Sequence, residues 1–183
     1  MRKIIGQIIL YTLLLSTLQV MGQEEIKRIV LDNQEIKIQG TSTLHDWESD
    51  CTQSQITIAA AFQENRFIRF DKIEVSIPVK GIKSGKGLMD KNTYDALKAD
   101  QYSDITFVYT SRTEHGIQGT LTIAGISKPI IIKAKQEGNV FQGSYTFKMS
   151  DYGITPPTVM MGTIKTGDEI KIVYKVTLPV NQL

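Results

Sequence analysis

The fold of this chain is decided by two stretches of its C-terminal half, GTLTIAGISKPIIIK at Gly119–Lys133 and FQGSYTFKMSDYGITPPTVMMGTIKTGDEIKIVYKV at Phe141–Val176. Both consist of short runs in which apolar and polar residues alternate, separated by turns that contain Gly, Pro or Asp. This alternation is typical of β-strands with one solvent-exposed face and one buried face. Such strands must either close on themselves or stack as two sheets. Closure around a large apolar interior would make a container for a hydrophobic ligand.

The same alternation recurs along most of the chain and predicts about eight strands, joined mostly by short turns. A last hairpin turn is predicted at Thr166–Asp168. Only Leu88–Ala99 has helical spacing, and Asp90 or Asn92 is the expected N-cap of this short helix. Because no strand–helix–strand rhythm is present, we expect an antiparallel sheet. The predicted fold is all-β, a single antiparallel β-barrel with one short helix, and a β-sandwich is the alternative.

The first 22 residues are typical of a secretory signal peptide, because Arg2 and Lys3 precede an uncharged apolar run and Gly22 comes before polar residues. A membrane anchor is the alternative, since a spanning helix needs about 20 apolar residues. We expect cleavage, which leaves one domain at residues 23–183 in the periplasm or outside the cell. Without Arg2 and Lys3 the chain has 19 Lys+Arg against 19 Asp+Glu, which argues against nucleic-acid binding.

Four segments of the chain together resemble the YceI-like family of exported polyisoprenoid-binding proteins. They are GTSTLHDW at Gly40–Trp47, LMDKNTYDALKADQYSDITF at Leu88–Phe107, GTLTIAGISKPI at Gly119–Ile130 and KMSDYGITPPTVMMGTIKTGDE at Lys148–Glu169. Their order and spacing carry the resemblance, which extends over essentially the whole predicted domain. It implies an extended, lipocalin-like barrel that holds a long-chain amphiphile in its lumen, such as a polyisoprenoid or the tail of an isoprenoid quinone.

The function implied by this resemblance is non-covalent binding, sequestration or transport of an isoprenoid-type lipid, rather than catalysis. No cofactor is expected apart from a bound isoprenoid lipid or quinone as ligand. A carrier of this kind would make transient contact with a membrane surface or a membrane protein. The sequence leaves the oligomeric state, and the choice between carrier and sensor, open.

The family's binding residues are spread over the barrel wall, so the candidate ligand contacts come from the apolar phase of each strand. The alternative is that these side chains fill the barrel as a solid core, which would suit a protein-interaction or stress-response accessory module. The candidate ligand-binding residues are Ile38, Trp47, Ile58, Val75, Ile77, Phe107, Tyr109, Leu121, Ile123, Ile132, Tyr145, Phe147, Ile172 and Tyr174.

The cluster His45-Asp46-Trp47 is the part of the sequence that most resembles an enzyme site. Adjacent residues of an extended strand point to opposite faces, so the imidazole and the carboxylate are poorly placed to pair. We interpret the cluster as a structural turn with a packed indole. Contact of His45 or Trp47 with a ligand head group is the alternative. A lipid-modifying enzyme with His45 as base is the hypothesis with least support.

Other chemistry has little support in the sequence. The chain has two histidines and one cysteine, without the spacing of a metal site, so we expect none. Cys51 follows the acidic residues Glu48 and Asp50, which would not lower its pKa, and this favours a small apolar core residue over a reactive thiol. The segment Gly81–Gly87 is expected to be a basic surface loop whose Lys80, Lys83 and Lys86 are in reach of anionic lipid head groups.

Overall fold

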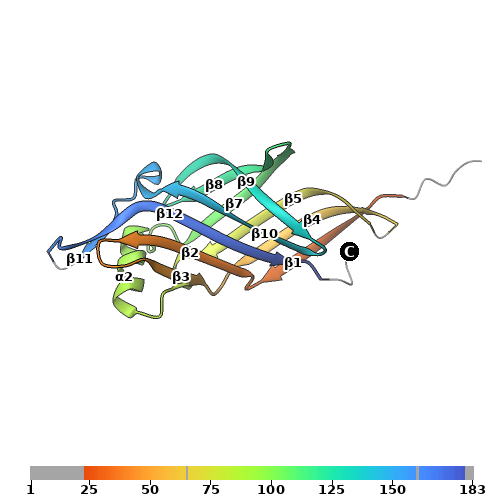
Figure 1. Ribbon diagram of the computed structural model, residues 1–183. Helices are drawn as coiled ribbons and strands as arrows, with labels where there is room; N and C mark the ends of the chain where they lie inside the picture. Colours follow the sequence, from red (N-terminus) through yellow and green to blue (C-terminus); the bar gives the residue numbers. More distant parts are fainter. Residues whose placement is uncertain (1–22, 65, 160, 180–183) are drawn as a thin grey trace, which may run out of the picture.

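The computed structural model describes residues 23–64, 66–159 and 161–179, so the predicted signal peptide lies outside the described residues. The described chain forms one curled antiparallel sheet, with helix α2 (Gly87–Ala96) at one end and the end of its last strand at the other (Figure 1). Two short 3-10 helices, η1 (Val79–Gly81) and η2 (Met149–Tyr152), interrupt the strands. The strands are β1 (Glu25–Asp32), β2 (Glu35–Ser42), β3 (Trp47–Cys51), β4 (Gln55–Gln63), β5 (Arg66–Pro78), β6 (Ile82–Lys83), β7 (Asp104–Thr113), β8 (Gly116–Ile123), β9 (Ile126–Glu137), β10 (Val140–Lys148), β11 (Thr158–Val159) and β12 (Ile164–Thr177).

The all-β, antiparallel prediction is confirmed, but the described sheet is a curled half-barrel that begins at β1 and ends at β6, rather than a closed barrel, and the strand count is higher than expected. Eleven described strands pair in the order β1-β4-β5-β7-β8-β9-β10-β12-β2-β3-β6, and β11 pairs with β12 at the side. The count is higher because local irregularities divide long extended segments into separate strands. Asn33 and Gln34 separate β1 from β2, and Asn33 has a φ of 52°. The ladder continues across this kink, since the Asn33 amide donates to the Ser54 carbonyl at 2.7 Å.

The sequence prediction also missed a strand and misplaced a turn. Strand β1 was not predicted, although its Ile29 and Leu31 alternate with exposed residues and are buried. The hairpin turn expected at Thr166–Asp168 is wrong, because β12 runs through these residues and its pairing with β2 shifts register between Thr166 and Ile170. Asp168 instead accepts hydrogen bonds from the Ser150 backbone amide and hydroxyl, at 2.8 and 2.6 Å, which fixes η2 against β12.

Helix α2 covers the end of the sheet next to β6. The predicted caps are wrong: Lys86 is the N-cap and makes no side-chain capping bond. Asp90 instead accepts hydrogen bonds from the amide and hydroxyl of Ser84, and these bonds hold the pKa of its carboxyl below the usual range. The Tyr94 hydroxyl accepts a bond from Lys83 Nζ at 2.7 Å and lies 3.0 Å from the Ile82 carbonyl, so the helix is tied to β6.

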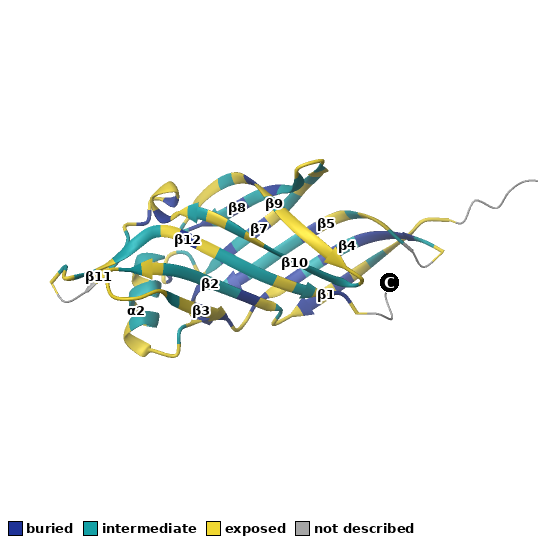
Figure 2. Ribbon diagram, viewed as in Figure 1, coloured by how far each residue is buried: buried dark blue, intermediate teal, exposed yellow. Residues whose placement is uncertain are grey.

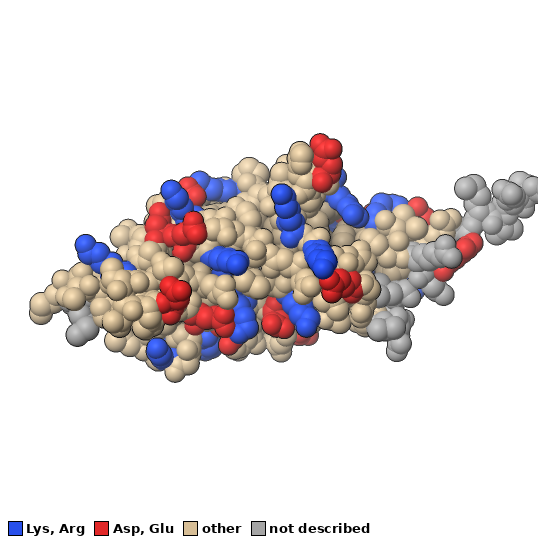
Figure 3. Space-filling view, in the orientation of Figure 1, with Lys and Arg blue, Asp and Glu red and all other residues tan. Residues whose placement is uncertain are grey.

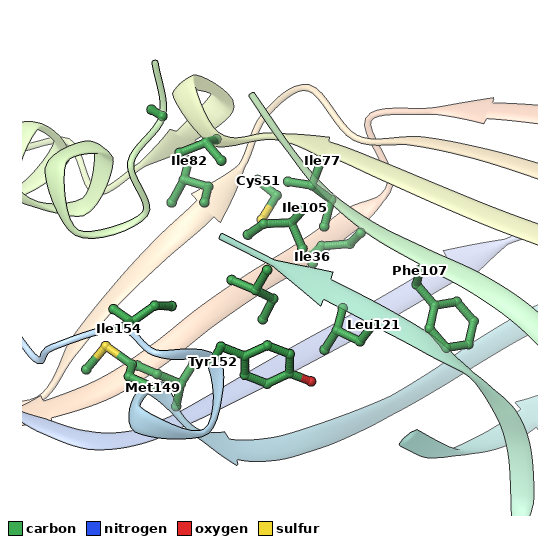
Figure 4. Close-up of a cluster of buried hydrophobic side chains, with 14 of the residues drawn as sticks. Ile36, Cys51, Ile77, Ile82, Ile105, Phe107, Leu121, Met149, Tyr152 and Ile154 are labelled. Atoms are coloured by element: carbon green, nitrogen blue, oxygen red, sulfur yellow. The ribbon is translucent and has the colours of Figure 1, made fainter. Parts of the chain in front are cut away.

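Buried hydrophobic side chains form two clusters along the length of the sheet. The larger one includes Ile36, Ile105 and Leu121, and Figure 4 shows these side chains converging from different strands. The second lies where β1 pairs with β4 and includes Phe62 and Leu178. Figure 2 shows buried and half-buried positions along most strands, whereas the second half of β9 is exposed. Burying one such aliphatic side chain contributes roughly 1.5–3 kcal/mol, so the two clusters dominate the stability of the fold.

The outer surface carries charges of both signs. Figure 3 shows Lys and Arg interspersed with Asp and Glu over the visible face. Several of them pair across neighbouring strands, as Lys37 of β2 does with Glu48 and Asp50 of β3. These pairs raise the pKa of Lys37, mainly through the hydrogen bond from its ammonium group to Glu48. Exposed pairs of this kind add little to stability, so the surface gives no argument for a strongly charged partner on this face.

Candidate ligand-binding cavity

Two adjoining cavities lie among the side chains of the curled sheet. The inner cavity has a volume of about 160 Å³. The outer cavity has a volume of about 330 Å³. Ile105 of β7 and Ile172 of β12 line both, so these two side chains form a waist where the cavities meet. The two cavities are therefore adjacent chambers that share part of their walls.

The inner cavity is lined only by hydrophobic and aromatic residues, almost all on strands. Their side chains come from the apolar phase of strands that are far apart in the sequence, which the curl of the sheet brings together. Most of the predicted candidates line this chamber: Ile58, Val75, Ile77, Phe107, Leu121, Ile132, Tyr145, Ile172 and Tyr174. The lining also includes residues absent from that prediction, Ile36, Ile56, Phe70, Ile73, Ile105, Ile117, Ile130, Ala134, Phe141, Val176 and Leu178.

The outer cavity has a different lining, because α2, the loop after β2 and the segments around β11 contribute to it. Among the predicted candidates it contains Ile38, Trp47, Ile123 and Phe147, together with Ile172 from the waist. From the sequence, His45 and Lys86 were considered as head-group contacts, but the list of candidate residues included neither these two nor any residue of α2. The lining residues outside that list are Ser42, Leu44, His45, Ser49, Ile82, Lys86, Leu88, Met89, Asn92, Thr93, Ala96, Leu97, Met149, Ile154, Pro157, Ile164, Thr166 and Ile170, besides Ile105 of the waist.

Tyr109 is the one predicted candidate that lines neither chamber. Its side chain is half-buried and packs against both hydrophobic clusters instead. The alternation of buried and exposed positions holds at Tyr109, which faces the same side as Phe107, but neither chamber extends to this part of β7, where its pairing with β8 shifts register between Tyr109 and Ser111.

Three glycines allow aromatic rings to lie flat on the sheet around the chambers. A Cβ at Gly40, Gly119 or Gly143 would overlap the ring of Trp47, the ring of Phe107 or the hydroxyl of Tyr174, respectively. The Tyr174 hydroxyl reaches across Gly143 and donates to the Lys133 carbonyl at 2.8 Å. The Trp47 indole donates to the Thr41 carbonyl at 3.0 Å. These bonds fix the rings, so the wall of the site is preorganised.

The tyrosines around the inner chamber keep it free of charge. Burial raises the pKa of Tyr174 to about 12. Burial also raises the pKa of Tyr145, with a smaller contribution from Asp151. Next to this chamber, burial raises the pKa of Tyr152 to about 12, and Tyr152 packs edge-on against Phe147 at 5.2 Å between ring centroids. At neutral pH all three hydroxyls are protonated, so the inner chamber suits an apolar chain.

The turn predicted at His45-Asp46-Trp47 is confirmed in part, because it extends over Ser42–His45 between β2 and β3, whereas Trp47 is the first residue of β3. The Ser42 hydroxyl donates to the His45 carbonyl at 2.7 Å, and the amides of Leu44 and His45 donate back to the same hydroxyl. His45 Nδ1 lies 2.6 Å from the Asp46 carbonyl, so this nitrogen carries the proton. Both His45 and Trp47 also line the outer chamber.

The segment Gly81–Gly87 is not the surface loop that was expected, because Ile82 and Lys83 form β6 and Gly87 begins α2. Lys80 pairs with Asp100 at 2.8 Å and Lys83 bonds to Tyr94, whereas Lys86 lines the outer chamber. Cys51 is buried, and desolvation raises the pKa of its thiol to about 12, which confirms its role as a core residue. In the described ranges, no group of three or more His, Cys, Asp or Glu side chains is arranged to hold a metal ion. Of the helices in the same ranges, none is both long and apolar enough to cross a membrane.

A comparison with known protein families matches residues 29–178 to the YceI-like domain. A UPF0312 protein of Pseudomonas aeruginosa (strain LESB58) is 32% identical over 100 residues, which cover 46% of this chain and 52% of that protein. A UPF0312 protein of Shewanella sp. (strain ANA-3) is 31% identical over 100 residues, which cover 45% and 52%. The chain thus spans about half the length of the curated relatives it matches.

Solved structures share the fold at low sequence identity. BcnA of Burkholderia cenocepacia superposes with a TM-score of 0.64 at 17% identity, over 80% of this chain and 96% of that one. A polyisoprenoid-binding domain from Saccharophagus degradans, implicated in plant cell wall breakdown, superposes with a TM-score of 0.60 at 9% identity, over 85% and 100%. The match to the family model over residues 29–178, on the fold described above, shows that this chain belongs to the YceI-like domain family.

Proposed function

We propose that this protein binds an isoprenoid-type amphiphile non-covalently, with the tail in the inner chamber and the head group in the outer chamber. The observation that carries the proposal is that a wholly hydrophobic chamber adjoins one that has polar groups along its edge. The likeness of the fold to a polyisoprenoid-binding domain supports the choice of ligand class. The action is binding rather than catalysis, and the curled sheet serves as a lipocalin-like container.

The size and chemistry of the chambers suit this ligand. Small-molecule sites measure roughly 300–1,000 Å³, and the two chambers together fall in this range. Each CH₂ that leaves water contributes about 0.8 kcal/mol, so a tail of several isoprene units binds tightly without polar recognition. Ser42, Asn92, Thr93 and Thr166 offer hydrogen bonds to a head group, and Lys86 offers a positive charge. Discrimination between ligands therefore depends on the head group and on the space available to the tail.

We further propose that cargo is exchanged at a membrane surface, after export to the periplasm or outside the cell. The rim of the outer chamber exposes Leu44 and Leu88, which are 67% and 70% exposed. The Thr43 amide, next to Leu44, donates a hydrogen bond to the Lys165 carbonyl at 3.0 Å. This bond places the loop that carries Leu44 beside the turn that carries exposed Met161. Side chains of this kind insert favourably into a lipid interface, and a tail that passes directly from bilayer to chamber avoids water.

Native mass spectrometry of detergent-free protein, followed by solvent extraction, tests the binding function. The expected result is a stoichiometric adduct that is released as a polyisoprenoid or quinone. Protein that is free of ligand and stays free after isoprenoids are added would contradict the proposal. That outcome would favour the protein-interaction module with a filled interior, and a search for a protein partner would follow.

A further inference from the structure

Four phenylalanines form a chain of ring contacts at the end of the inner chamber that lies away from α2. The ring centroids of Phe62 and Phe67 are 6.1 Å apart, those of Phe67 and Phe70 are 4.6 Å apart, and those of Phe70 and Phe141 are 5.6 Å apart. Phe62 and Phe67 flank the β4–β5 turn, and Phe141 follows the β9–β10 turn. Figure 1 places both turns at the end of the molecule opposite the helix.

The contact between Phe70 and Phe141 crosses the inside of the curled sheet. Phe70 is on β5 and Phe141 is on β10, and three strands, β7, β8 and β9, lie between these two in the sheet. Rings on such distant strands can touch only across the concave side. Both rings line the inner chamber, whereas Phe62 and Phe67 lie behind them and do not line it. The Phe70–Phe141 pair is therefore a bridge across the lumen.

The bridge is held in place by its surroundings. Fully buried Leu178 follows β12 and also lines the inner chamber. Its amide donates to the Asn139 carbonyl at 2.9 Å, and the Asn139 side-chain amide donates to the Leu178 carbonyl at 2.6 Å. These two bonds lock the β9–β10 turn, and with it the start of the strand that carries Phe141, against the end of β12. The Phe141 side of the bridge is therefore anchored to the C-terminal end of β12.

We propose that the Phe70–Phe141 bridge sets the longest isoprenoid tail that the protein accommodates. The inference rests on the proposed function, because it assumes a tail that enters from the outer chamber and passes the waist at Ile105 and Ile172. A tail that reaches the bridge has no further apolar volume to fill. Each additional CH₂ then stays in water, and its contribution to binding, about fourfold in affinity, is not gained.

The affinity for a series of isoprenoid alcohols with one head group and increasing length tests this inference. Geraniol, farnesol, geranylgeraniol and solanesol are titrated into wild type, Phe141→Ala and Phe70→Ala. Wild-type affinity is expected to rise along the series and then stop rising. In both variants the rise continues to longer alcohols, with a gain of at least about fourfold for the first alcohol beyond the wild-type limit.

Phe67→Ala is the matched control, because it removes the same ring from the same aromatic cluster behind the bridge. Its length limit should equal that of wild type. If the alanine variants fail to fold, Phe141→Leu should still lengthen the accepted tail and Phe141→Trp should shorten it. An unchanged length limit in the bridge variants, or an equal shift in Phe67→Ala, would contradict the proposal that the bridge sets this limit, while leaving lipid binding intact. Wild type that binds none of the alcohols would contradict the proposed function and, with it, the proposed length limit.

Discussion

The inner and outer chambers are built by different means, although they share the residues of the waist. The inner chamber is made almost entirely of strand residues whose apolar phase points inward. The outer chamber takes side chains from a helix, a loop and turns, and mixes polar with apolar groups. The regular sheet thus produces an apolar chamber with little chemical selectivity. The irregular segments add polar groups that can distinguish one head group from another. Substitutions that affect one chamber and spare the other can therefore test this division.

The largest loss of stability should follow from a carboxylate in the inner chamber, compared with a carboxylate in the outer chamber. Leu121 is buried in the wall of the inner chamber, so Leu121→Asp puts a carboxylate where no polar group can pair with it. A loss of about 3–5 kcal/mol in the free energy of unfolding is expected, with loss of retained lipid. Asn92→Asp is the control in the outer chamber, where a change within about 0.5 kcal/mol is expected. Urea denaturation measures both, and equal losses would show that the chambers do not differ in polarity.

The second effect concerns the glycine contacts that place aromatic rings on the wall. A Cβ at Gly143 would overlap the Lys133 carbonyl and the Tyr174 hydroxyl, so Gly143→Ala should displace Tyr174 and cost about 1–3 kcal/mol. Gly87 begins α2 and has open space around its Cα. Gly87→Ala should therefore be neutral within about 0.5 kcal/mol. Thermal unfolding compares the two variants, and a neutral Gly143→Ala would mean that the ring of Tyr174 is not fixed by this contact.

A third prediction uses the protonation of the buried tyrosines. The pKa of Tyr174 is raised to about 12, above the value near 10 in an unfolded chain. Between these values the unfolded state loses its proton first, so stability is fully present below about pH 10 and falls as the pH rises further. Tyr152 is raised to about 12 as well and acts in the same direction.

Denaturation midpoints measured from neutral to alkaline pH in wild type, Tyr174→Phe and Tyr152→Phe check this prediction. Each variant should have a shallower alkaline decline, by an amount on the order of 1 kcal/mol. The raised pKa values of Lys37 and Cys51 give the same sign of slope in every protein of the set, so the difference between wild type and variant isolates the tyrosine. Parallel curves would show that neither phenol is desolvated.

The division between the chambers also explains how much the sequence could predict. Alternation placed Ile58, Leu121 and Tyr174 in the inner chamber because a strand allows its side chains only two directions. Alternation gave Tyr109 the correct face but could not show that the chambers end short of it, and it gave no warning of the kink at Asn33. Both features depend on which strands pair, and the period of one segment carries no information about its neighbours.

The outer chamber could be predicted only in part. Trp47 and Phe147 were found through strand phase, but Leu88 and Asn92 were not, because nothing in a short helix specifies which end of a sheet it covers. The predicted caps Asp90 and Asn92 suited the local preference for polar N-caps. The helix nevertheless begins earlier, because Asp90 binds Ser84 and Tyr94 anchors α2 to β6. Tertiary contacts decided the boundary, as is common for short helices.

The smallest effect on stability, and the sharpest test of the rim, should come from Leu44→Ser and Leu88→Ser. Both side chains are largely exposed, so each change should alter the free energy of unfolding by less than about 0.5 kcal/mol. The rate at which a fluorescent isoprenoid moves from vesicles into the protein should nevertheless fall, because each variant has less apolar surface to insert into the interface. Val108→Ser on β7 is the control, since Val108 is exposed but lines neither chamber. If all three variants take up the isoprenoid at the wild-type rate, cargo enters through water or by another route. The exposed leucines would then have no part in the exchange.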